Sequence, residues 1–86
     1  MAAVTLVYFA WVREKVGRSE ETVELPAHIE TVSDLMTWLK SRGAEYASAF
    51  ARSEVIRAAI DQHHVRPTAS IRGARDIAFF PPVTGG

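Results

Sequence analysis

The feature that most constrains the fold is an almost wholly apolar run over residues 4–11, which is rich in β-branched and aromatic side chains. Successive side chains of an extended strand point to opposite faces. One face of this run would carry Val4, Leu6, Tyr8 and Ala10, and the other Thr5, Val7, Phe9 and Trp11. A strand with apolar side chains on both faces is typical of the middle of a sheet. We therefore expect residues 4–11 to form a central strand.

The clearest helix signal begins at Thr31 and ends at Gly43. Thr31 is a favourable N-cap residue, and the acidic Asp34 follows three positions later, near the positive end of the helix dipole. Apolar residues recur with the helical period at Val32, Leu35, Met36 and Leu39. Gly43 would supply the left-handed residue that stops the helix. The pattern predicts a helix whose apolar face packs on a sheet.

Weaker patterns predict the other elements. They are a helical turn at 12–17, strands at 22–25, 55–61 and 76–80, and a short helix at 45–51 with Tyr46 and Phe50 on one side. The polar segments 62–67 and 71–75 are expected to be connections. This order of elements predicts an α+β domain of two layers, with the main helix packed across one face of a mixed sheet.

Length and composition limit the possible functions. The 86 residues suffice for a single domain, and ten basic residues balance ten acidic ones, so no net charge favours nucleic acid. No stretch approaches the roughly 20 apolar residues of a membrane helix, and the first residues do not resemble a signal peptide. The absence of cysteine excludes disulfides, thiolate metal ligands and a cysteine nucleophile. We expect a cytoplasmic protein that binds neither nucleic acid nor membrane.

Side-chain chemistry offers few candidates for an active site. His63 and His64 are adjacent, so they point apart in an extended chain and do not suit one metal ion; we expect no metal site. The serines lack the glycine-flanked turn of a nucleophilic serine. Glu20 and Glu21 form a carboxylate pair that we interpret as a solvated hairpin surface. The functional group has to be sought elsewhere.

The C-terminal segment has a distinctive composition. The last predicted strand runs into the sequence Phe79-Phe80-Pro81-Pro82-Val83-Thr84-Gly85-Gly86. Two prolines favour an extended conformation that projects from the domain. Two glycines have no side chains, so the last carboxylate could pass through a narrow channel in another protein. The reactive group would then be the main-chain carboxylate of Gly86, which needs prior activation because a free carboxylate is ionised and a poor electrophile.

This ending resembles that of the small subunits of molybdopterin synthase, a family of ubiquitin-like sulfur carriers. Residues 78–86, Ala-Phe-Phe-Pro-Pro-Val-Thr-Gly-Gly, match the family's terminal motif throughout. Near the start, Tyr8-Phe9-Ala10, Arg13-Glu14 and Gly17 resemble the family's first strand and turn. The resemblance covers essentially the whole chain. It departs from the family at residues 73–76, Gly-Ala-Arg-Asp, where an acidic Asp-Gly-Asp-Glu turn is usual.

The resemblance implies a β-grasp domain over residues 1–80 and an extended tail over residues 81–86. In such carriers, an ATP-dependent activating enzyme similar to ubiquitin-activating enzymes adenylates the terminal carboxylate, here that of Gly86. A sulfur donor then converts it to a thiocarboxylate. The large subunit of the synthase receives the tail, and the sulfur passes to cyclic pyranopterin monophosphate to form the dithiolene of molybdopterin. The family typically assembles as two small and two large subunits.

These implications assign roles to residues of this chain. Gly86 would be the working residue, and the tail positions that enter the partner's channel would be Pro81, Pro82, Val83, Thr84 and Gly85. Whichever of Phe79 and Phe80 lies outside the core is the natural anchor for a partner. The chain itself would bind no cofactor, because ATP is used by the activating enzyme. It would be the non-catalytic, sulfur-carrying subunit of a sulfurtransferase and inert alone.

Three alternatives remain open. A sulfur carrier of another pathway, such as thiamine biosynthesis, would use the same tail chemistry. A ubiquitin-like protein modifier would join Gly86 to lysine side chains of target proteins. A plain β-grasp interaction module would keep its activity after removal of Gly85 and Gly86.

Overall fold

The computed structural model describes residues 2–82; residue 1 and residues 83–86 are outside this description. The elements are, in chain order, β1 Ala2–Tyr8, α1 Ala10–Val16, β2 Glu20–Leu25, α2 Val32–Lys40, α3 Ala44–Ala49, the 3-10 turn η1 Ser53–Val55, β3 Arg57–Ile60, β4 His63–Val65 and β5 Asp76–Phe80. Within the described residues the strands form one mixed sheet in the order β2-β1-β5-β3-β4. The pairing of β1 with β5 is parallel and the other pairings are antiparallel. The predicted α+β class with a mixed sheet is confirmed.

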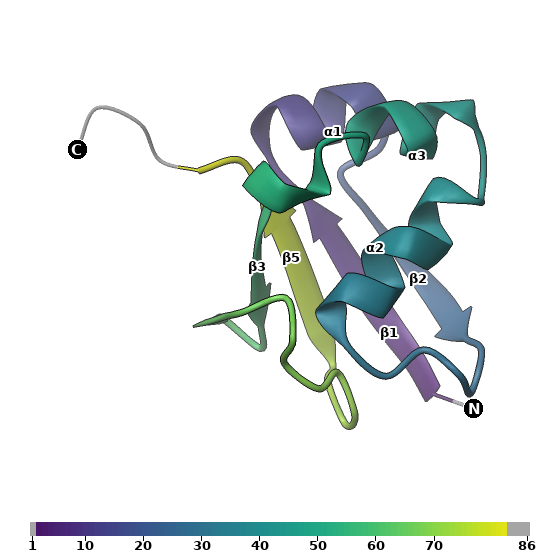
Figure 1. The fold of residues 1–86 in the computed structure, drawn as a ribbon, viewed down its shortest axis with the longest axis vertical. Coiled ribbons are helices and arrows are strands. Elements are labelled where there is room, and N and C mark those ends of the chain that lie inside the picture. The colour runs from purple at the N-terminus through teal and green to yellow at the C-terminus, as the bar shows by residue number, and fades with distance from the viewer. Residues whose placement is uncertain (1, 83–86) are drawn as a thin grey trace.

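The helices cover one face of the sheet and leave the other face open. In Figure 1, α2 crosses in front of β1 and β2, and α1 and α3 lie together beyond the ends toward which β1 and β5 point. The core lies between these helices and the sheet. Its largest fully buried side chains are Tyr8, Phe50, Phe79, Leu6, Leu35, Leu39, Ile77, Val12 and Val32. Tyr46 and Phe50, which the sequence places on one side of the short helix, are both buried.

The first strand, β1, is central as predicted, but it is shorter than the apolar run. The strand ends at Tyr8, and Ala10 has a positive φ of 52° that turns the chain directly into α1. The predictions that Ala10 and Trp11 belong to the strand are therefore wrong, because both lie in α1. The second face of β1 is not covered by a helix, and Phe9 is 49% exposed. Apolar side chains on both faces thus indicated a central position without indicating burial on both sides.

The main helix, α2, begins where the sequence predicts and ends earlier. Oγ1 of Thr31 accepts a hydrogen bond from the backbone N–H of Asp34 (3.1 Å), and Oδ2 of Asp34 accepts one from the backbone N–H of Thr31 (3.2 Å). This reciprocal capping box satisfies two N–H groups at the start of the helix. The prediction that Gly43 stops the helix is wrong. Ser41 caps the C-terminal end and donates its hydroxyl to the carbonyl of Trp38 (2.6 Å), and Gly43 instead precedes α3.

The segment predicted as a polar connection contains the strand β4. Asp61 and Gln62 have positive φ angles of 48° and 73°, and they form a two-residue turn between β3 and β4. β4 is three residues long and lies at the edge of the sheet with both of its histidines exposed. Because β4 is exposed, its sequence does not show the apolar alternation that marks a half-buried strand. β3 begins at Arg57 rather than residue 55, because the preceding residues form η1.

Candidate functional site

The last strand, β5, sends its two phenylalanine side chains to opposite faces of the sheet. Phe79 is 0% exposed, and its ring centroid lies 6.3 Å from that of Tyr8 and 5.2 Å from that of Phe50. Phe80 is partly exposed on the open face, where its ring centroid lies 5.2 Å from that of His64. Of the two candidate anchors, Phe80 is the one outside the core. Whether a partner contacts it stays a prediction.

The strand registers place small and apolar side chains in a row across the open face. Residues directly opposite each other in paired strands point to the same face. Val7 of β1 lies opposite Ala78 of β5, which lies opposite Ala59 of β3. These three residues and Phe9 line a shallow hollow on this face. The apolar strip of Val7, Ala78 and Ala59 therefore lies beside Phe80 in the middle of the open face. The same hollow is also lined by polar side chains, those of Thr5, Glu20, Gln62 and Asp76.

Phe9 is a member of this surface that the sequence analysis did not single out. It is the only exposed large apolar residue among residues 2–82. Its backbone N–H donates to the carbonyl of Phe79 (3.1 Å), which holds Phe9 beside the end of β5. The alternation of β1 put Phe9 on the face opposite Tyr8. The sequence did not show which of those faces the helices would cover, so its exposure was not predicted.

The tail base, defined as Phe80, Pro81 and Pro82, joins the end of β5 to the predicted tail, of which Pro81 and Pro82 are described. β5 ends at Phe80, and the two prolines follow without regular secondary structure and with intermediate exposure. The remaining predicted site residues, Val83, Thr84, Gly85 and Gly86, lie outside the described residues. Their roles, like the division into residues 1–80 and 81–86, stay predictions.

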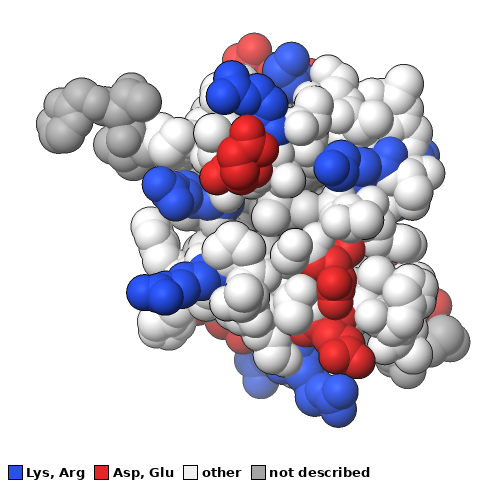
Figure 2. Space-filling model, in the orientation of Figure 1, with Lys and Arg blue, Asp and Glu red and all other residues white. Residues whose placement is uncertain are grey.

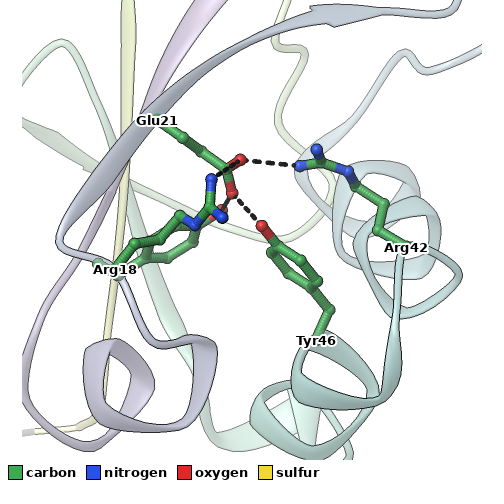
Figure 3. Close-up of polar contacts among 5 residues, drawn as sticks. Arg18, Glu21, Arg42 and Tyr46 are labelled. Atoms are coloured by element: carbon green, nitrogen blue, oxygen red, sulfur yellow. Dashed lines mark hydrogen bonds and ion pairs between the residues drawn. The ribbon is translucent and has the colours of Figure 1, made fainter.

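A polar network on the covered side of the sheet connects β1, β2 and α3 with two loops (Figure 3). Oε2 of Glu21 accepts hydrogen bonds from the hydroxyls of Tyr8 (2.8 Å) and Tyr46 (2.6 Å). Oε1 of Glu21 pairs with the guanidinium groups of Arg18 (3.3 Å) and Arg42 (3.2 Å). The Glu21 side chain is only 7% exposed. The interpretation of Glu20 and Glu21 as a solvated pair is therefore wrong for Glu21, because the tertiary fold brings distant donors to it.

This environment sets the ionisation of the network. Burial alone raises the pKa of Glu21, but the hydrogen bonds from Tyr46 and Tyr8 and the charge of Arg42 outweigh burial, so the pKa is lowered. Burial, followed by the hydrogen bond to Glu21, raises the pKa of both tyrosines. At neutral pH Glu21 is a carboxylate and the tyrosines are neutral donors. These contacts join β1, β2 and α3 to the loop before β2 and the loop after α2, so the network stabilises the covered side.

The histidines that the sequence analysis considered lie on the edge strand. Nδ1 of His63 lies 3.1 Å from the carbonyl oxygen of Asp61, and the ring of His64 lies against Phe80. Among residues 2–82 there is no group of three or more His, Asp or Glu side chains placed to hold a metal ion. Within the same residues, the helices are too short to cross a bilayer.

The fold and this surface define a class of protein. A mixed sheet covered by helices on one face, with the C-terminal strand beside β1 in its middle, is the β-grasp arrangement of ubiquitin-like proteins. The solved structure of the small archaeal modifier protein SAMP1 from Haloferax volcanii superposes with a TM-score of 0.71 at 19% identity, covering 99% of this chain and 100% of that one. At this identity the similarity shows the fold, and the predicted β-grasp fold is confirmed.

Sequence comparison identifies the family. Residues 6–86 match the ThiS family, and this chain belongs to it. The molybdopterin synthase sulfur carrier subunit of Escherichia coli is 32% identical over 83 residues, covering 96% of this chain and 99% of the relative. The protein of the same name from Haemophilus influenzae is 29% identical over 83 residues, with the same coverage. The resemblance on which the sequence analysis relied is confirmed.

Proposed function

We propose that this chain is a sulfur carrier subunit in the biosynthesis of the molybdenum cofactor. The observation that carries the proposal is the similarity, over nearly the whole chain, to relatives named molybdopterin synthase sulfur carrier subunit. A relative from Mycosarcoma maydis with this name is 32% identical over 88 residues. The same name in bacteria and a fungus supports this assignment over the thiamine pathway.

The proposed working group is the carboxylate of Gly86. The carboxylate attacks the α-phosphorus of ATP on the activating enzyme, which forms an acyl-adenylate and releases pyrophosphate. Hydrosulfide then attacks the acyl carbon, the bond to AMP breaks, and the products are a thiocarboxylate, AMP and a proton. The product is anionic and nucleophilic at sulfur, so the site that receives it has to supply cationic groups and exclude water. We assign those groups to the large subunit, which would take the tail and hold the pterin precursor.

The open face supports different roles for the two parts of the chain: the body of the domain is recognised by the partner, and the tail carries the reacting group. The tail offers little surface for recognition, because two of its residues are glycines. Phe80, with Phe9 and the apolar strip beside it, offers the surface that a partner could cover. We propose that partners recognise the open face and the tail base, and that the tail then delivers Gly86 to their active sites.

Intact mass tests the proposal directly. The full chain is incubated with its activating enzyme, ATP and a sulfur source, and the expected product carries one sulfur in place of one oxygen at Gly86. Deletion of Gly86 abolishes the mass change and leaves the melting temperature unchanged, because the buried core of the described residues is complete at Phe79. Arg72→Gln, an exposed substitution in a loop, is the matched control and retains the mass change.

Three results would contradict the proposal. An unchanged mass for the wild-type chain, with an activating enzyme shown to work on another carrier, would exclude a sulfur carrier. Adducts between Gly86 and lysines of other proteins in a cell lysate, formed without a thiocarboxylate, would instead identify a protein modifier. A thiocarboxylate that the large subunit and the pterin precursor cannot consume would point to another sulfur pathway.

A further inference from the structure

Charge is unevenly distributed across the open face of the sheet. β2 forms one edge, and its register with β1 puts the exposed Glu20 and Glu24 on this face. On the same face, toward the other edge of the sheet, Arg57 of β3 pairs with Phe80 of β5 and is also exposed. Adjacent strands are about 4.8 Å apart, so the edge strands β2 and β4 are about 19 Å apart. The face therefore has an acidic edge and, next to the tail base, a basic side. The middle between them is apolar except for the exposed Asp76 at the start of β5, which its register with Thr5 places on the same face.

A second arginine strengthens the basic side. Ala58 pairs with Val65, so Arg66 lies next to Arg57 one step further along the hairpin. Both arginines line one shallow hollow together with His64, whose ring contacts Phe80. Figure 2 views the molecule from the helix-covered side, and from this side Lys and Arg side chains protrude at the left edge, where Figure 1 shows β3. Arg57 and Arg66, the arginine pair, thus lie on one side of the partly exposed Phe80, next to the tail base.

Within residues 2–82 these two cations have no acidic partner. The ion pairs there join Arg18 and Arg42 to Glu21, and Arg52 to Glu54. Glu54 lines a groove with both Arg57 and Arg66, but its carboxylate is paired with Arg52 at 3.6 Å. Like charges on neighbouring strands destabilise a sheet. The pair therefore opposes folding slightly, and a carboxylate supplied from outside would remove that repulsion.

We propose that Arg57 and Arg66 dock acidic side chains of the activating enzyme and orient this enzyme on the open face. The inference rests on the proposed function, because it concerns the partner that adenylates Gly86. The enzyme covers Phe80 and the apolar strip, and its carboxylates lie opposite the arginine pair. With the acidic edge of β2 on the other side, only one orientation matches charges on both sides. That orientation directs the tail base toward the catalytic site.

The charged margins of the surface favour the activating enzyme as the partner of the arginine pair. Long-lived subunit interfaces are large and mainly apolar. Here the apolar area is limited to the middle of the face, and its margins are charged. Charged margins accelerate association and give contacts that separate readily. A carrier needs such a contact with its activating enzyme, because it has to leave before it can deliver sulfur.

The tail is long enough to keep the docking contact of the arginine pair away from the reacting carboxylate of Gly86. Six residues beyond Phe80 reach at most roughly 20 Å, whereas charges are screened over about 8 Å at physiological ionic strength. The acidic docking surface would therefore not weaken the cationic groups that bind ATP phosphates and the carboxylate of Gly86. Docking and chemistry can depend on opposite charges within the same enzyme.

The test compares two double variants that each remove two positive charges. The test variant is R57Q/R66Q. The control is R72Q/R75Q. Its two exposed arginines lie in the loop just before the start of β5, whereas Phe80 is the last residue of that strand. Carrier-dependent exchange of pyrophosphate into ATP is measured with the full chain and the activating enzyme at increasing carrier concentration. At low ionic strength R57Q/R66Q raises the KM for the carrier about tenfold without changing kcat, and the control changes KM less than about twofold.

Salt and stability sharpen the test. In about 0.5 M salt the difference in KM between R57Q/R66Q and the wild type falls below about threefold, because screening removes the attraction. The melting temperature of R57Q/R66Q equals or exceeds that of the wild type, since the repulsion is gone. If the double variant melts lower, R57Q and R66Q are measured singly, and each is expected to raise KM about threefold.

The outcomes separate the inference from the proposed function. Equal KM values for both double variants at low salt, with an active wild type, overturn the inference and leave the proposed function intact. No exchange with the wild-type chain overturns both. An unchanged KM with weaker capture by the large subunit also overturns the inference, because the arginine pair would then serve the other partner.

Discussion

The two faces of the sheet are made from the same strands and have opposite uses. The adjacent residues Phe79 and Phe80 show the contrast: one ring is closed off by Tyr8 and Phe50, and the other lies partly exposed against His64. The covered face holds the domain together. The open face carries apolar and charged side chains that the domain leaves partly accessible. Apolar character alone therefore does not distinguish a residue of the core from one that is available for binding.

Truncation of Phe79 has the largest expected effect on stability. Phe79→Ala removes a ring that contacts two aromatic neighbours and has no access to solvent. Such a change lowers the free energy of unfolding by about 3–5 kcal/mol, because apolar burial is lost and a cavity remains. Urea denaturation at neutral pH measures the difference from the wild type. A loss below about 1 kcal/mol would show that the covered face does not stabilise the domain as described.

Acid weakens the covered side through Glu21. Its pKa is lowered in the folded state, so its contribution to stability is complete above the unfolded value of 4.5 and is lost as the pH falls through the folded pKa. Urea denaturation of the wild type between pH 7 and pH 3 is expected to show a steeper loss of stability than that of Glu21→Gln. Asp61, whose pKa is lowered by hydrogen bonds from the backbone of Asp76 and Arg75, contributes to the loss in both proteins. Equal pH profiles would mean that the Glu21 network is not formed.

Truncation of Phe80 has the smallest expected effect on stability. Phe80→Ala lowers the free energy of unfolding by less than about 1 kcal/mol, because the ring is only partly buried against His64. Its effect should appear in binding instead, as a higher KM for the carrier in pyrophosphate exchange. The pair of substitutions at positions 79 and 80 thus tests the comparison within one strand. A Phe80→Ala protein that unfolds as readily as Phe79→Ala would assign both rings to the core.

Local signals were sufficient for much of the fold. The capping box at Thr31 and Asp34, the period of α2 and the central position of β1 follow from neighbouring residues and were predicted. The strand β4 was missed because its three residues are polar and gain their conformation from pairing with β3. The stop at Gly43 was misplaced because Ser41 ends α2 earlier with a local hydrogen bond.

The candidate site likewise has a part that the sequence predicts and a part that only the tertiary structure brings together. The terminal motif, including Phe80, is readable in the sequence because it is contiguous. Phe9 and the arginine pair are not, because strand pairing alone places Arg57 opposite Phe80 and brings Arg66 beside Arg57. The partners of Glu21 likewise come from β1, the loop before β2, the loop after α2, and α3. Patterns of neighbouring residues do not indicate contacts between segments that are distant in the sequence.

The sequence by itself determined the fold class, the main helix and the family resemblance, since each depends on periodicity or on consecutive residues. Tertiary structure alone decided which face of β1 and β5 the helices cover, and hence that Phe79 is core and Phe80 is surface. It also decided that Glu21 is enclosed while its neighbour Glu20 stays exposed. The physical reason is that alternation defines two faces of a strand equally well, and only packing against other elements removes one of them from water.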